Sequence, residues 1–105
     1  MRSKITTIAA AIAILGFGAA APMTALAYPG SSLAQGARIP LARARVIALA
    51  ARPGTIIAQE LEREGGGSGL RYSFDIRSAR VVYEVGIDAN TGAVLENAPE
   101  GARPD

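Results

Sequence analysis

Two neighbouring runs of this sequence repeat with a period of two residues. The first covers Leu70 to Arg77 and the second Val81 to Asp88, with a short break between them. A period of two is typical of antiparallel strands that bury one face and expose the other to water. The pattern places Asp88 on the solvent side. The expected buried positions are Leu70, Tyr72, Phe74 and Ile76 in the first run and Val81, Tyr83, Val85 and Ile87 in the second.

A further strand is predicted on each side of this pair. Thr55 to Glu64 precedes it, and a short strand at Ala93 to Glu96 follows turn residues at Ala89 to Gly92. In the earlier strand one face is expected to carry Ile57, Gln59 and Leu61, and the other Ala58, Glu60, Glu62 and Glu64.

One helix is predicted before the strands, over Pro40 to Ala51. Small and apolar residues recur there at spacings of three and four, and Pro53 with Gly54 ends the pattern. Arg45 and Arg52 lie seven residues apart on a stripe that we expect to be solvated. The predicted fold is therefore α+β, with one N-terminal helix packed on a three- to four-stranded antiparallel β-meander.

Matching the apolar faces gives a predicted register. Leu61 opposite Tyr72 brings Glu62 opposite Arg71 on the solvent side. The other predicted pairs are Ile76 with Val81, Phe74 with Tyr83, Tyr72 with Val85, and Ile87 with Val94.

The first 27 residues have the three parts of a secretory signal peptide. Arg2 and Lys4 precede an apolar run over residues 5–18, and small residues stand at positions 25 and 27. This pattern predicts cleavage between Ala27 and Tyr28. A retained membrane anchor is the alternative, since the uncharged stretch reaches the roughly 20 residues that cross a bilayer. Ala, Gly and Thr dilute the apolar run, which favours cleavage, and the absence of Cys excludes a lipoprotein anchor.

Removing residues 1–27 from the 105-residue chain changes its charge. The whole chain has 11 basic and 9 acidic residues, but the remaining part has nine Arg and nine acids, with no Lys, His or Cys. A net charge of zero argues against a nucleic-acid partner. The missing residue types exclude disulfides, Cys nucleophiles and the usual bases that activate Ser or Thr. We therefore expect no catalytic residues and no cofactor.

The remaining polar features are weak candidates for a site. Glu60, Glu62 and Glu64 alternate on one strand face and are able in principle to hold a hard cation, but pairing with Arg71 is the expected arrangement. We treat these four residues as the candidate binding surface. Gly65 to Gly69 is expected to be a flexible hairpin loop, because no Lys follows it as in a phosphate-binding loop. The sequence from Asp88 to Gly92 is interpreted as a turn rather than a calcium loop, since the later bidentate Glu is missing.

The order of these elements resembles the PepSY family. The likeness covers residues 39–96 and is most specific from Tyr83 to Leu95, a strand ending in Ile-Asp-Ala-Asn-Thr-Gly and followed by Ala-Val-Leu. It implies a non-enzymatic domain outside the cytoplasm. Turn and linker residues predict a flexible lead (28–38) before this domain, and Pro99, Gly101 and Pro104 predict a disordered tail (97–105) after it. Members occur in propeptides of secreted thermolysin-type metalloproteases and as small exported proteins.

Two functions are consistent with this resemblance. One is binding and modulation of an extracytoplasmic protein, such as a protease, with inhibition as one form of it. The other is a small-ligand or cation-binding module of the periplasm. No membrane contact is expected after signal cleavage, and the residues give no oligomeric state.

Overall fold

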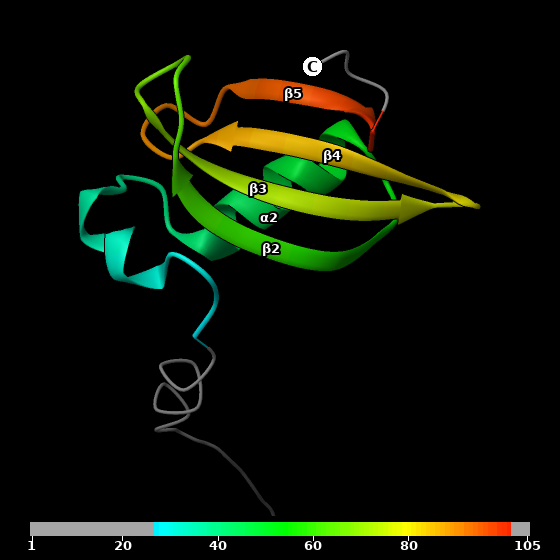
Figure 1. Cartoon of the computed structure of the whole chain (residues 1–105), viewed down its shortest axis with the longest axis horizontal. Coiled ribbons are helices and arrows are strands. Elements are labelled where there is room, and N and C mark those ends of the chain that lie inside the picture. Colours follow the sequence, from blue (N-terminus) through cyan, green and yellow to red (C-terminus); the bar gives the residue numbers. More distant parts are fainter. Residues whose placement is uncertain (1–26, 102–105) are drawn as a thin grey trace, which may run out of the picture.

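Four antiparallel strands form one sheet in the order β2-β3-β4-β5 (Figure 1). A computed structural model describes residues 27–101, so all but the last residue of the predicted signal peptide lies outside the described part. The α+β prediction is confirmed. The elements are the 3-10 helix η2 (Ser31–Gly36), the helix α2 (Leu41–Ala51) and the strands β2 (Thr55–Arg63), β3 (Leu70–Ser78), β4 (Val81–Asp88) and β5 (Val94–Pro99).

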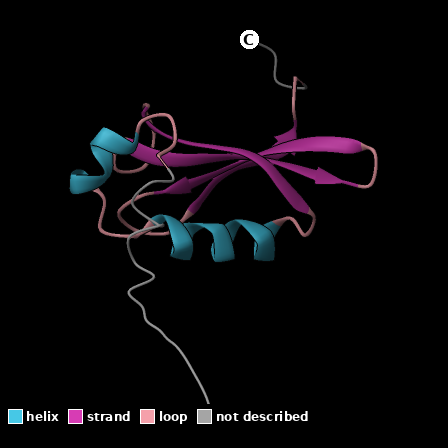
Figure 2. Cartoon of the chain, turned by 90° about the horizontal axis from the view of Figure 1, so that it is seen from below, coloured by secondary structure: helices cyan, strands magenta, loops and turns pink. Residues whose placement is uncertain are grey.

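Helix α2 covers one face of the sheet, here called the covered face (Figure 2). No described helix or strand lies over the opposite face, here called the outer face. The alternation of β3 explains this two-layer arrangement, because every second side chain points to the helix. The buried core consists of Ala44, Ala48, Leu61, Leu70, Tyr72, Phe74, Ile76, Val85, Ile87 and Ala89.

The helix packs through small residues and is tied to both sheet edges by arginine. Ala44 and Ala48 are fully buried against the sheet. Arg45 donates through Nη1 to Oε1 of Gln59 in β2. Arg52 donates to Oδ1 of Asn97 in β5 at 3.1 Å, and its guanidinium lies 3.7 Å from the centre of the Tyr83 ring. The expectation of a solvated arginine stripe was therefore wrong, because long Arg stems pack on apolar surface while their heads reach polar partners.

The hairpin between β3 and β4 is tighter than predicted. Ser78 pairs with Val81, so the loop has two residues, and Ala79 adopts a φ of 58°. A two-residue hairpin needs such a left-handed residue. Compared with the prediction, the register is shifted by two positions. The observed pairs are Ile76 with Tyr83, Phe74 with Val85 and Tyr72 with Ile87.

Two apolar residues predicted on the buried face are exposed. Val81 lies at the hairpin tip and is 41% exposed. In β2 the register slips between Ile56 and Ala58, and Ile57 is 44% exposed while Ile56 packs against the core. A β-bulge of this kind adds one residue to a strand and turns the following side chains to the other face. The remaining pairs predicted for β2, including Leu61 with Tyr72, are confirmed.

Both ends of the described chain contain secondary structure where none was predicted. Strand β5 runs to Pro99, and the N–H of Glu100 donates to the carbonyl of Val82, so the first part of the predicted disordered tail is strand. The predicted flexible lead contains η2 and contacts the core through Tyr28 and Leu33. The predicted pair of Ile87 with Val94 is confirmed.

Candidate partner-binding surface

Three of the rows of side chains that run across the outer face of the sheet form the candidate surface, and a further row holds Thr55, Arg77 and Val82. Each row follows from the pairing register, because directly paired residues point to the same face. The charged side chains of these three rows are mainly acidic. The rows are Glu62, Arg71 and Asp88; then Glu60, Ser73, Gly86 and Glu96; then Ala58, Asp75, Glu84 and Ala98.

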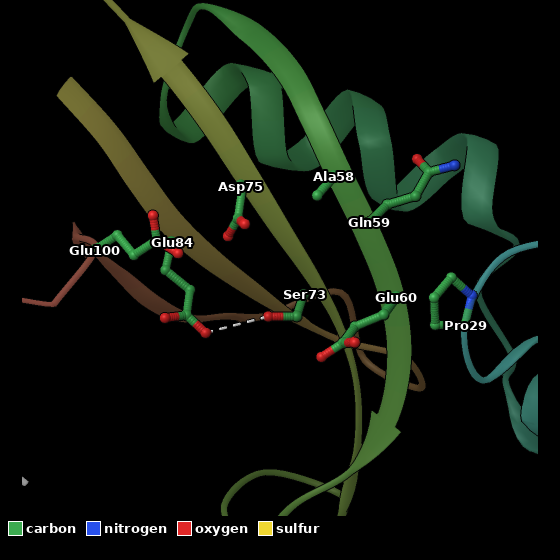
Figure 3. Close-up of a pocket in the computed structure, with 8 residues that line it drawn as sticks. All are labelled: Pro29, Ala58, Gln59, Glu60, Ser73, Asp75, Glu84 and Glu100. Atoms are coloured by element: carbon green, nitrogen blue, oxygen red, sulfur yellow. Dashed lines mark hydrogen bonds between the residues drawn. The ribbon is translucent and has the colours of Figure 1, made fainter. Parts of the chain in front are cut away.

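A hollow of about 300 Å³ opens on this face (Figure 3). Four carboxylates and no basic side chain line it, and the hydroxyl of Ser73 donates to Glu84 at 3.4 Å within it. Asp75 is paired directly with Glu84, and like charges in that position destabilise a sheet. We call this the acidic hollow; its lining residues are Pro29, Ala58, Gln59, Glu60, Ser73, Asp75, Glu84 and Glu100.

Arg71 is the buried cation of the outer face. Its Nη1 lies 3.4 Å from Oε1 of Glu96, and its Nη2 donates to the carbonyl of Gly65 at 3.2 Å. Gly86 lies between Arg71 and Glu96 in the sheet, and a Cβ at that glycine would lie 3.0 Å from Nη1. The predicted register of Glu62 opposite Arg71 is confirmed, but the ion pair that the structure gives Arg71 is with Glu96.

Glu60 and Glu62 of β2 and Glu64, directly after that strand, act on one another. Burial, followed by the hydrogen bonds and charges of Glu60 and Glu64, raises the pKa of Glu62 to about 8. Three carboxylates at alternate positions of one strand face repel when all are ionised. This group of side chains therefore favours positive charge nearby.

Asp88 is buried, contrary to the predicted solvent-facing position, and fastens the glycine-rich loop. Its carboxylate accepts hydrogen bonds from the backbone N–H and hydroxyl of Ser68 at 2.6 and 2.9 Å, and from the N–H groups of Asn90 and Thr91. Burial opposes ionisation, but these bonds outweigh it and lower the pKa of Asp88 to about 2. Gly67, with a φ of 56°, passes so close that a Cβ would overlap the carboxylate. The loop predicted to be flexible is thus held to the turn after β4.

The arrangement gives no metal centre in the part of the chain that is described. Within residues 27–101 no group of three or more His, Cys, Asp or Glu side chains is placed to hold a metal ion. In the same range no helix is long and apolar enough to span a bilayer.

Residues 38–97 match the family described as "Peptidase propeptide and YPEB domain", or PepSY. The chain belongs to the PepSY family. The matched range differs by one residue at each end from the range that resembled PepSY in the sequence. No curated protein and no solved structure matches the chain.

The candidate surface of this PepSY domain is wider than the four residues predicted for it. Glu60, Glu62 and Arg71 all lie on the outer face, and Glu64 follows directly after β2. The remaining members were missed in the sequence. Alternation alone would have added Ser73, Asp75 and Glu84. Placing Glu96 beside them needed the irregular register between Gly86 and Ile87, and placing Glu100 needed the true length of β5.

Proposed function

We propose that this PepSY domain is an exported, non-enzymatic module that binds an extracytoplasmic peptidase and restrains it. The observation that carries the proposal is the family match, which covers α2, strands β2 to β4 and β5 as far as Asn97. The family description names peptidase propeptides. The N-terminal pattern of residues 1–27 supports export.

The chemistry of the domain supports a binding role rather than catalysis. Residues 28–105 contain no His, Lys or Cys, so a Ser or Thr nucleophile lacks its usual activating partners. A propeptide-like module acts by occupying surface on its peptidase, which needs an exposed and chemically distinct face. The outer face, with its acidic hollow, is such a face.

The proposal is tested with purified residues 28–105 and the peptidases secreted by the producing organism. We expect saturable loss of cleavage of a fluorogenic protein substrate and a complex that co-elutes in gel filtration. Glu62→Arg should weaken the effect, whereas Arg43→Glu on the exposed side of α2 should not. Unchanged activity of every secreted peptidase at saturating domain would refute the proposal.

A further inference from the structure

Strand β2 is an edge of the sheet whose outward backbone groups are only partly occupied in the described part of the chain. The N–H of Leu61 points away from β3, because it donates to the carbonyl of Pro29 at 3.0 Å. Groups along an antiparallel strand alternate in direction, so those of Gln59 and Arg63 also point away from β3. An exposed edge of this kind is a template for another extended chain.

The chain's own N-terminal segment occupies this edge at one point. We call residues 28–36 the strap. Gly30 has a φ of 84° and runs so close to β2 that a Cβ would overlap the carbonyl oxygen of Leu61. Tyr28 packs against the core, and burial followed by the neighbouring Tyr28 raises the pKa of Tyr72 to about 12. The strap, a turn at residues 29–30 followed by η2, therefore shows that an outward N–H of this edge accepts a backbone carbonyl with an aromatic side chain beside it.

Few contacts hold the strap in place. Helix η2 has no buried residue, and its side chain at Leu33 is partly exposed. A second hollow of about 360 Å³ lies between η2 and the glycine-rich loop. Segments with few buried contacts open more easily than the core of a protein. The strap is therefore the part of the fold that we expect to open before the sheet does.

The side chains along β2 define what an added strand must carry. Side chains of neighbouring strands meet on the same face, and opposite charges across strands stabilise the pair. On the outer face the new strand meets Glu60 and Glu62, which favours Lys or Arg at alternate positions. On the covered face it meets Leu61, where Tyr28 now packs nearby, which favours an apolar or aromatic residue between them.

We infer that the β2 edge from Gln59 to Arg63 docks an extended partner segment in which basic and apolar residues alternate, and that the strap competes with it. The inference rests on the proposed function in that it names the kind of segment a peptidase partner would present. Strand addition supplies affinity through backbone hydrogen bonds and specificity through alternate side chains. Because the strap must leave first, binding is weakened by the fraction of molecules in which it is closed.

The test uses the full mature chain and a defined peptide. The probe is a short blocked peptide in which Arg alternates with Val and Tyr, and its matched control has Glu in place of Arg. Gly30→Val opens the strap by collision with Leu61, and Tyr28→Ala opens it by removing the aromatic anchor. Gly65→Val is the control variant, since Gly65 has a negative φ and open space around it.

Both opened variants should bind the Arg peptide at least about tenfold more tightly than wild type, as expected when a closed state is removed. Hydrogen exchange at the Leu61 amide should speed up in these variants and slow again with the peptide. The inference is overturned if opened and wild-type chains bind alike, or if the Glu peptide binds equally well. It is also overturned if the opened variants exchange straps as dimers that protect Leu61 without peptide. This binding test contains no peptidase, so its result does not depend on the proposed function. If the Arg peptide binds as expected but the domain restrains no secreted peptidase, only the proposed function is refuted.

Discussion

The two faces of this sheet differ in what their side chains contribute. The covered face is apolar and closed by α2, and Phe74, Ile76, Val85 and Ile87 are fully buried there. The outer face has Asp75 opposite Glu84, and it has Glu60, Glu62 and Glu64 at alternate positions in and directly after β2. Both arrangements oppose folding. The residues of the covered face are therefore explained by packing in the core, whereas those of the outer face are suited to contact with a cationic partner.

The largest effect should come from the covered face. Phe74→Ala should lower the free energy of unfolding by about 3–5 kcal/mol, since it removes a buried ring and leaves a cavity. Urea titration of the variant and of wild type measures this loss of stability. Val46→Ala is the control, because Val46 is 65% exposed on α2. Equal losses in the two variants would contradict the assignment of the core.

Arg71 is the residue of the outer face on which stability should depend most. Arg71→Ala should cost about 3 kcal/mol, because it leaves Glu96 without its buried cation. Arg77→Ala is the matched control, because Arg77 lies six residues further along the same face of β3 but is exposed, and it should change little in the same urea titration. A loss no larger than that of the control would show that the Arg71 ion pair is not structural.

Asp88 should contribute through its hydrogen bonds to the glycine-rich loop. Asp88→Asn should cost about 1–3 kcal/mol at neutral pH, because a buried acceptor of several N–H groups is weakened. Its folded pKa of about 2 is below the ordinary 3.8, so its stabilisation is complete above pH 4 and is lost as the pH falls towards 2.

The pH dependence of unfolding tests this assignment. Thermal melts between pH 2 and pH 5 should show a smaller decline in Asp88→Asn than in wild type. Asp75→Asn is the control on the outer face and should not lower stability, since it relieves the contact with Glu84. An identical decline in Asp88→Asn and wild type would contradict the role of Asp88.

The smallest effect has the opposite sign. Glu62 has a folded pKa of about 8 against an ordinary 4.5, so the folded state binds more protons and stability falls as the pH rises between these values. Glu62→Gln should remove this loss and stabilise the domain above pH 8 by less than about 1 kcal/mol, after allowing for solvent screening. Urea titrations at pH 4 serve as the control, because both side chains are then neutral. A variant that is less stable than wild type at pH 9 would contradict the repulsion.

The elements were predictable because they depend on local patterns. The helix, the four strands and the closing hairpin follow from spacing and turn residues. The register between β3 and β4 could not be predicted in this way. Both runs alternate with a period of two, so a shift of two residues pairs their apolar side chains equally well. The tight turn decides it, and Ala79 gives no sequence sign of a left-handed conformation.

The candidate site was less predictable because its residues depend on long-range contacts. Asp88 looks solvent-facing by alternation, but its partner Ser68 is 20 residues away in a loop with no pattern of its own. Arg71 was correctly placed opposite Glu62, whereas its ion pair forms with Glu96, two strands away, where Gly86 leaves space. The strap has no periodicity, and its place at the edge depends on one backbone hydrogen bond from Leu61 and on packing of Tyr28 and Leu33 against a core that is distant in sequence.

Site-specific crosslinking tests the central claim that a peptidase binds at the outer face and its β2 edge. A photo-crosslinking amino acid replaces Glu62 in one variant and Val46 in the other, and the producing cells are irradiated. The account predicts a crosslinked peptidase, identified by mass spectrometry, from the Glu62 variant and none from the Val46 variant. A peptidase captured through Val46 and not through Glu62 would contradict it.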